Sequence, residues 1–519
     1  MASKMGKRSR GDNAEQQAEQ QVTQKEIPEM VNVEGVRSCF AKMTNALRGR
    51  EIGLSIRDGA IPAVVLVTFL KYTSDRRDEL GLKMSDLYRF DALCELFPKV
   101  IGFRQLREHL QDIELHLGLS RFLLHEVILE ARGANGEEQF RRALEAARGL
   151  DFTSSDAASE TVQALLETID QMAKTSKSLL GPVVTNLGVA KLMSSLLMVH
   201  DGDDVYAPFV GLGLAVGSAV NGKDVTVFAR DTIATCAAVT LLILIMSGVQ
   251  RGEVDCGDVF DSAHGRIHER LYDKVICDPP PFPTWEPRGN IHLLYPEEPL
   301  NDPWLPVRHI LASLKPGGRA AVLLPMGLMT RYGKPAAMRA RLIEDGYIEA
   351  VVELPGGVAY GSGYKSTLLM LSNPGTTQSI SGRIFFCDLT SHSWGGGEKA
   401  EERIAQRIIA RETIPGKTAF ASREEMARND YQLACARYVA AEVDKDQYLT
   451  DLGRLYEKAR DLQDRYEALN KTVDDITDEY FLRALSPRKN ARGGKARDAA
   501  KATKTTKAMK KEEENDVRR

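Results

Sequence analysis

The sequence predicts an α/β protein in which a mostly parallel sheet is covered by helices on both faces and flanked by helical segments. The first observation behind this fold class is a series of short apolar runs, separated by helical stretches, that begins after Gly181. Apolar runs of about four to eight residues between helices are typical of buried parallel strands. The runs are DVYAPFV, DVTVFA, YDKVICD, RAAVLLP, IEAVVELP, STLLMLSN and RIFFCDL.

The second observation is helical periodicity on both sides of that region. From Val33 to about Gly181, segments such as FRQLREHLQDIELHLG carry apolar residues at three- and four-residue spacing, and the same spacing returns from Glu424 to Leu485. A chain of 519 residues is long enough for two or three domains. The predicted domains are a helical N-terminal domain over 28–181, an α/β domain over 182–440 and C-terminal helices over 441–485.

The two ends of the chain lack the apolar residues that a packed core requires. Residues 1–27 are polar and rich in Gln and Glu, and residues 486–519 are rich in Lys, Arg, Ala and Thr. We therefore predict that both ends are disordered. A basic tail of this kind attracts phosphate backbones without reading their sequence, although a solubilising tail without a partner has the same composition.

The predicted C-terminal helices carry apolar residues near heptad spacing. This spacing has two interpretations, a helix that packs on its own domain and a coiled-coil helix that binds a partner, and the sequence favours neither. The residues at this spacing are Leu449, Leu452, Tyr456, Ala459, Leu462, Tyr466 and Leu469.

Composition excludes several classes of protein. The longest apolar stretch, Ala237–Met246, is too short to span a bilayer, and the N-terminus lacks the apolar core of a secretory signal. The seven cysteines are scattered without a CxxC motif, so we expect reduced core thiols in a cytoplasmic protein and no metal site. The formal net charge of −3 argues against a wholly basic nucleic-acid binder.

Two strand ends carry residues suited to a cofactor, because open α/β sheets bind ligands at the carboxyl ends of their strands. Within Val205–Gly217, a strand runs into a turn with Gly211 and Gly213, which let the backbone approach a ligand closely. A tight turn without a ligand has the same sequence. The strand DVTVFARD ends on Asp231, which can bind ribose hydroxyls or cap the following helix.

Two further loops carry acceptors for amines. Asp258 lies in a short polar loop and could accept a hydrogen bond from an adenine amine. Asp278-Pro279-Pro280 follows an apolar strand, and because proline has no amide donor, this loop presents acceptors. Acceptors that face an exocyclic NH2 hold the amine and localise its lone pair for attack on a methyl sulfonium. A proline-stiffened turn without function is the alternative.

An aromatic side chain next to these acceptors could stack on a base that has been flipped out of a duplex. Phe282 and Trp285 are the candidates. The order of the motifs, with a glycine turn and two acidic residues before the proline pair, makes the group more specific than any one motif.

Taken in order, these segments resemble the HsdM-type modification subunits of type I restriction–modification systems, a gamma-class N6-adenine DNA methyltransferase family. The resemblance covers roughly residues 33–480. The matching blocks are LRG (Leu47–Gly49), FLKYTSDRRDEL (Phe69–Leu80), VVTNLGVAKLMSSLL, LKPGGRAAVLLPMGLM (Leu314–Met329), RLIEDGYIEAVVELPGGVAYGSGYKSTLLML and NDYQLACARYV (Asn429–Val439).

The resemblance implies a Rossmann-like class I methyltransferase domain that transfers a methyl group from S-adenosyl-L-methionine to adenine N6 in DNA. It implies DNA and an HsdS-like specificity subunit as partners, with a second copy of the chain and a restriction subunit as further candidates. The residues implied at the cofactor are Thr185, Pro208, Gly211, Gly213, Asp231 (at the ribose) and Asp258 (at the adenine). The residues implied at the target amine are Asp278, Pro279, Pro280 and Phe282.

The sequence departs from the family pattern at both motifs. The family has Asp-Pro-x-x-Gly-x-Gly-Gly at the cofactor loop, where this chain has Ala207 for the acid and Leu214 for the last glycine. The family's Asn-Pro-Pro-Phe becomes Asp278 followed by three prolines, with Phe282 one place later. We expect Leu214 to crowd the loop. The departures keep open an inactive or weak, structural DNA-binding subunit of a defence complex, and a protein or RNA amino-methyltransferase as a third interpretation.

Overall fold

The chain divides into two compact units, residues 1–441 and 442–519, each of which is described by itself. The predicted disordered ends, 1–27 and 486–519, lie outside the residues that the structure describes. The computed structural model describes residues 32–47, 59–119, 134–175, 184–261, 270–281, 285–289, 291–358, 364–375, 382–391, 400–439 and 445–485.

The described residues before the sheet are predominantly helical, as predicted. Each helix buries an apolar face, and in α5 the buried residues Leu106, Leu110 and Ile113 follow three- and four-residue spacing. The helices are α2 (Val33–Leu47), α3 (Ala60–Asp75), α4 (Phe90–Leu96), α5 (Phe103–His116), α6 (Ala134–Ala146) and α7 (Ser155–Thr175), with short 3-10 helices η1 (Asp86–Tyr88) and η3 (Ala147–Gly149).

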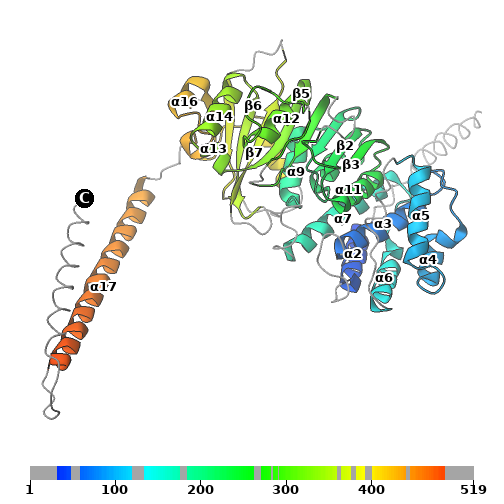
Figure 1. Cartoon of the computed structure of the whole chain (residues 1–519), viewed down its shortest axis with the longest axis horizontal. Coiled ribbons are helices and arrows are strands. Elements are labelled where there is room, and N and C mark those ends of the chain that lie inside the picture. The colour runs from blue at the N-terminus through cyan, green and yellow to red at the C-terminus, as the bar shows by residue number, and fades with distance from the viewer. Residues whose placement is uncertain are drawn as a thin grey trace, which may run out of the picture. The chain divides into compact units, whose positions relative to one another are not determined.

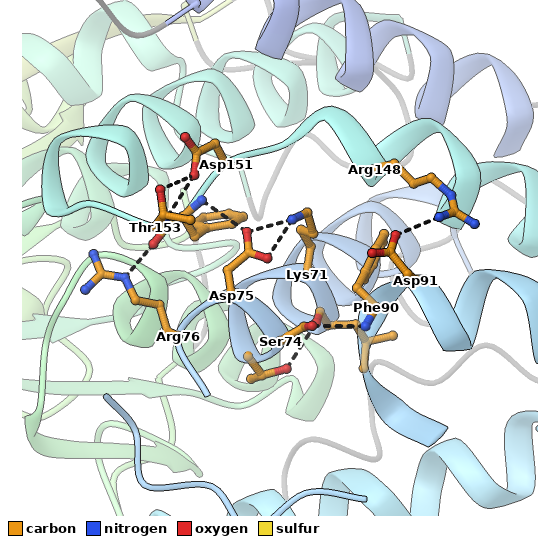
Figure 2. A network of polar contacts seen from close by, with 12 residues as sticks. Lys71, Ser74, Asp75, Arg76, Phe90, Asp91, Arg148, Asp151 and Thr153 are labelled. Carbon is orange, nitrogen blue, oxygen red and sulfur yellow. Dashed lines mark hydrogen bonds and ion pairs between the residues drawn. The ribbon is translucent and has the colours of Figure 1, made fainter. Parts of the chain in front are cut away.

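A network of polar contacts ties the end of α3 to the chain before α7 (Figure 2). The Asp75 carboxylate accepts hydrogen bonds from Lys71 Nζ at 2.6 and 2.7 Å and from Phe152 N at 3.3 Å. Arg76 Nε donates to Phe152 O at 2.5 Å. Burial raises the pKa of Asp75, and the Lys71 ammonium opposes that shift. The block Phe69–Leu80, which carries part of the family resemblance, therefore supplies contacts that hold the N-terminal helices together.

One nine-stranded sheet lies in the described residues, in the order β3-β2-β1-β4-β5-β7-β6-β8-β9. The strands from β3 to β5 in this order pair in parallel, whereas β7 is antiparallel to both of its neighbours and β9 is antiparallel to β8. The α/β fold class is confirmed. The strands are β1 (Asp204–Pro208), β2 (Thr226–Asp231), β3 (Arg251–Cys256), β4 (Tyr272–Cys277), β5 (Leu314–Pro325), β6 (Ile348–Gly356), β7 (Lys365–Ser372), β8 (Arg383–Asp388) and β9 (Thr418–Ser422).

Helices cover both faces of the sheet because successive strand residues point to opposite sides. In β1, Val205 and Ala207 belong to one hydrophobic core and Tyr206 to the other. The helices in the first core are α9 (Leu187–Leu197), α10 (Leu214–Val220), α11 (Ala234–Met246) and α15 (Ala400–Ile409). The helices in the second core are α12 (Leu305–Ala312), α13 (Gly327–Thr330), α14 (Lys334–Glu344) and α16 (Arg423–Arg428).

The N-terminal helices share the first of these cores with the sheet. Figure 1 shows them beside β2, β3 and α11, at one end of the sheet. Helix α3 packs against α11, and both helices are apolar around most of their circumference, as expected for helices buried on all sides. Five of the seven cysteines are buried in these cores, namely Cys94, Cys236, Cys277, Cys387 and Cys435.

The described residues of the second unit form one long helix, α17 (Lys445–Leu485). The C-terminal helical extension predicted from the sequence is thus present. Among the described residues, no helix combines the length and apolar character that crossing a membrane requires.

Candidate active site

The predicted site residues gather at one edge of the sheet. Because β3, β2, β1, β4 and β5 are parallel, their carboxyl ends meet at the same edge. Pro208 is paired in register with Arg230, and Asp231 with Cys256, so the ends of the first three strands lie level. The topology thus brings the glycine turn, the acidic residues and the proline pair together.

The glycine turn after β1 is held against α11. Thr240 Oγ1 donates a hydrogen bond to Gly211 O at 3.1 Å. Gly213 has a φ of 78°, and a Cβ at this position would lie 2.9 Å from Thr240 Oγ1, so the turn requires glycine for its conformation and its packing. Leu214 begins α10 and is 1% exposed within the first core. The expectation that Leu214 crowds the loop is wrong, because its side chain points into the core.

Asp231 closes this turn from the end of β2. Its Oδ2 accepts a hydrogen bond from Gly211 N at 2.9 Å and its Oδ1 accepts one from Ile233 N at 2.9 Å. Burial raises the pKa of Asp231, and these amide donors counteract the shift. Each carboxylate oxygen has a second lone pair, so Asp231 holds the loop and retains capacity for hydroxyl donors. The predicted cap of the following helix is wrong, because α11 has Ile233 as its N-cap and no side-chain cap. Asp231 holds the loop instead, which leaves the predicted role at the ribose open.

A buried ion pair next to Asp231 escaped the sequence analysis. Arg230 and Asp255 are paired in register on β2 and β3, their charged groups form a short hydrogen bond, and both side chains are 0% exposed. Arg230 Nη1 also donates to the main-chain oxygens of Asp258 at 3.1 Å and Asp261 at 3.3 Å. The pair therefore fixes the loop that carries Asp258. A signal was available for Arg230, a charge that directly follows the apolar run Val227–Ala229 of β2, whereas Asp255 lies in the polar sequence RGEVDC.

Asp258 lies in this loop with an exposed side chain. Its Oδ1 accepts a hydrogen bond from Phe260 N at 2.9 Å, which forms a local turn. The Phe260 ring is buried and packs edge-on against Trp285, with ring centroids 4.9 Å apart. The loop therefore offers a carboxylate to solvent on one side and an aromatic contact on the other.

Asp278 follows β4 and meets a residue from a distant part of the chain. Thr185 Oγ1 donates a hydrogen bond to Asp278 Oδ2 at 2.7 Å, across 93 positions of sequence. Burial raises the pKa of Asp278 to about 6, and the Thr185 hydroxyl opposes that shift. The sequence placed Thr185 at the cofactor, whereas the structure places its hydroxyl on the acceptor predicted for the target amine.

The two prolines after Asp278 line a cavity of about 300 Å³. This volume is at the lower end of the range for small-molecule sites, and most of its lining is apolar or prolyl. Phe282, the predicted stacking residue, lies outside the described residues. The lining residues are Pro279, Pro280, Trp285, Asn301, Pro303, Pro306, Leu324, Pro325, Leu328 and Arg331.

Trp285 lines this cavity and also contacts the loops that follow β1 and β3, where the cofactor residues are predicted. Its ring lies 5.4 Å from the ring of Phe209, measured between centroids, in addition to its contact with Phe260. Phe209 follows β1 and has a φ of 55°, a conformation that is rare for an aromatic residue. This turn directs the Phe209 ring toward Trp285, so three loops meet in one aromatic cluster between the two parts of the site.

Comparison with known proteins gives the family. A family model described as N-6 DNA Methylase matches residues 161–447 of the 519-residue chain. The chain belongs to the N-6 DNA methylase family. It is 24% identical over 322 residues to a type I restriction enzyme MjaVIII methylase subunit from Methanocaldococcus jannaschii, covering 55% of this chain and 54% of that protein. The chain thus spans about half the length of the curated relatives it matches.

Solved structures confirm the fold of this N-6 DNA methylase. A type I restriction–modification methyltransferase subunit from Streptococcus thermophilus matches with a TM-score of 0.62 at 19% identity, covering 79% of this chain and all of that one. A chain solved in work on complex assembly and conformational transition of the type I R-M system matches with a TM-score of 0.58 at 19% identity, covering 86% and 99%. The class I methyltransferase fold expected from the family resemblance is therefore confirmed.

The fold and family are those of S-adenosylmethionine-dependent methyltransferases, and the residues of the site fit that cofactor. Asp231 retains acceptor capacity for ribose hydroxyls, Gly211 leaves the loop without a side chain, and the exposed Asp258 can accept from an amine. Ala207 and Pro208 are buried at the end of β1, where they build the strand beneath the loop.

Proposed function

We propose that this chain is the modification subunit of a type I restriction–modification-like system, an adenine-N6 DNA methyltransferase that requires a separate specificity subunit. The observation that carries the proposal is the end of β4, where Asp278 precedes two prolines that line a cavity sized for a small ligand. Family membership supports the reaction class. The glycine turn and Asp231 at the same edge support the cofactor.

The geometry suggests how the chain's residues divide the work. A flipped adenine would enter the cavity and stack on Trp285, with its N6 amine donating hydrogen bonds to the Asp278 carboxylate and the Pro279 carbonyl. Two acceptors localise the nitrogen lone pair on the side away from its protons. When bound, S-adenosylmethionine would supply a methyl group on a positively charged sulfur, and that sulfur would keep the electron pair of the broken sulfur–carbon bond. The amine then releases one proton to solvent.

The cofactor side would act by binding alone. We assign the ribose to Asp231, the adenine of the cofactor to Asp258, and close backbone approach to the loop from Pro208 to Gly213. Arg230 and Asp255 hold the loop that carries Asp258 in place. Phe282 belongs to the target side in this proposal, as the sequence predicts.

Helix α17 supports the partner part of the proposal. Its apolar residues recur at spacings of three, four and seven from Leu452 to Tyr480, which is the pattern of a coiled-coil seam. These residues are between 50% and 76% exposed. We propose that a helical segment of the specificity subunit packs on this seam, and that this subunit selects the DNA sequence. The residues are Leu452, Leu455, Leu462, Tyr466, Leu469, Val473, Ile476 and Tyr480.

A methyl-transfer assay tests the proposed function. The full chain, co-purified with the specificity subunit, is incubated with tritiated S-adenosylmethionine and genomic DNA from a strain without adenine methylation. We expect label in N6-methyladenine, and Asp278→Ala should lower the rate by at least about a thousandfold because it removes the amine acceptor. Label in another base or in protein, or full activity of Asp278→Ala, contradicts the proposal. So does a folded complex that binds cofactor and DNA but transfers no methyl group.

A further inference from the structure

We infer that Thr185 is a positioning residue for Asp278: its hydroxyl occupies one carboxylate oxygen and leaves the other for the amine. The inference rests on the proposed function, because it assigns Asp278 to the target amine. It replaces the cofactor role that the sequence predicts for Thr185. The Thr185 hydroxyl donates to Asp278 Oδ2 at 2.7 Å.

The carboxylate has few other neighbours that could hold it. Within the described part of the chain, Thr185 is the only hydrogen-bond partner of Asp278. Burial raises the pKa of Asp278, and Thr185 is the one group there that lowers it. Its neighbour Cys277 stays neutral, because burial raises the pKa of that thiol. Without the Thr185 hydroxyl, no donor among the described residues would fix the orientation of the Asp278 carboxylate. The hydroxyl therefore decides which carboxylate oxygen faces the substrate.

Thr185 is followed directly by a segment that is held in place at the start of α9. The Asn186 side chain caps α9 by accepting from Gly188 N at 2.9 Å and Val189 N at 3.3 Å. Asp170, from α7, accepts from Leu187 N at 2.9 Å. With these contacts next to it and only 9% exposure, the Thr185 side chain has a fixed place from which to donate.

The chemistry explains why a hydroxyl suits this chain. The family motif has an asparagine at this place, and an asparagine side chain has its own NH2 donor and one oxygen acceptor. An ionised Asp278 has two acceptor oxygens and no donor. A donor on Oδ2 makes the carboxylate behave as a one-sided acceptor, which is the arrangement that an amine requires.

The matched variants are Thr185→Val, which removes the hydroxyl at nearly constant shape, and Thr185→Ser, which keeps it. We expect Thr185→Val to lower kcat about tenfold or more, with the KM for S-adenosylmethionine within about threefold of wild type. The acid limb of the kcat profile should move upward by roughly 0.5–1 pH unit, since the lost donor stabilised the ionised carboxylate. Thr185→Ser should restore both.

Thr240→Val is the control, because Thr240 also donates from a buried hydroxyl but to the cofactor loop. It should leave the acid limb in place. Equal shifts in both variants, or a Thr185→Val variant whose only defect is a raised KM for S-adenosylmethionine, overturn the inference. The second result would return Thr185 to the cofactor.

A readout without turnover separates this inference from the proposed function. Free energies of unfolding are measured for the full chain with Thr185→Val, Asp278→Ala and both changes. The two effects should be non-additive, more so at pH 8 than at pH 5, because the hydroxyl interacts more strongly with the ionised carboxylate. Additivity at both pH values overturns the inference even where methyl transfer is intact. Coupling in a protein without methyl transfer supports the contact and counts against the proposed function alone.

Discussion

Asp75 and Asp278 are both carboxylates whose pKa is raised by burial, yet their surroundings differ. Asp75, among the N-terminal helices, receives hydrogen bonds from the Lys71 ammonium and from Phe152 N. Asp278, at the end of β4, receives one from the neutral Thr185 hydroxyl and has no other partner among the described residues. The first carboxylate has a counter-charge and two donors, whereas the second has capacity for a further donor.

This difference separates a structural carboxylate from a functional one. A buried carboxylate with a cation and a main-chain donor cannot be removed without leaving both partners unpaired, which is destabilising. A carboxylate with one neutral donor, next to a cavity, is destabilising on its own and suited to bind a substrate donor. Substitutions in the two regions should therefore change different quantities.

The largest effect on stability is expected for Asp75→Ala. It leaves the largely buried Lys71 ammonium unpaired and removes the acceptor of Phe152 N, so the free energy of unfolding should fall by about 2–4 kcal/mol. Methyl transfer per folded molecule should stay within about twofold of wild type. Urea unfolding and initial rates, measured on the same samples, check both. If Asp75→Ala lowered the methyl-transfer rate but not the free energy of unfolding, the proposed difference between the two regions would be wrong.

A change of pH is expected to have an intermediate effect on the free energy of unfolding. The pKa of Asp278 is about 6 in the folded chain and close to 4 in an unfolded one. Because the folded value is raised, the protonated form is favoured by folding, and stability is lost as the pH rises from about 4 through 6. The free energy of unfolding of wild type should therefore fall over this window relative to Asp278→Asn, by on the order of 2 kcal/mol.

Unfolding of wild type and Asp278→Asn at pH 4, 5, 6 and 7 measures this difference directly. A constant gap between the two proteins would mean that Asp278 titrates normally. Its surroundings would then resemble solvent, contrary to its position at the end of β4.

The smallest effect is expected within the N-terminal network itself. Asp91 pairs with Arg148 at 2.6 Å, but its side chain is 81% exposed, so Asp91→Ala should cost no more than about 0.5 kcal/mol. Figure 2 shows this pair close to the Asp75 cluster. Thermal unfolding of Asp75→Ala and Asp91→Ala in parallel checks the contrast. Similar losses from the two variants would show that burial is not what gives Asp75 its role.

The sequence predicted the central strands and missed the two at the edges. The apolar runs correspond to β1, β2 and β4 to β8, while β3 and β9 are the outermost strands of the sheet. The sequence RGEVDC of β3 has exposed residues at its start, and TAFAS of β9 is only partly buried. An edge strand needs no continuous apolar run, because part of it faces solvent. Apolar patterning therefore detects interior strands and misses edges.

The sequence predicted which residues lie at the strand ends of the site, but it did not predict contacts between residues that are distant in the sequence. Gly211, Asp231 and Asp278 lie at or just after the ends of β1, β2 and β4, so parallel topology alone brings them to one edge. The Thr185–Asp278 contact joins residues 93 positions apart, one just before α9 and one just after β4. It depends on how α9 packs on the sheet, which no local pattern encodes. For the same reason, the effect of Leu214 was misjudged. The direction of its side chain depends on how α10 packs.

Calorimetric titration of S-adenosylmethionine into the full chain tests the central claim. The claim is that Asp231, after β2, holds the cofactor, whereas Asp278, after β4, holds the target amine. Wild type and Asp278→Asn should bind with equal affinity, and Asp231→Ala should lose binding, because Asp231 holds both the loop and the ribose. The co-purified complex with the specificity subunit is titrated in parallel. Equal binding by Asp231→Ala, or no binding by folded wild type in either form, would contradict the account.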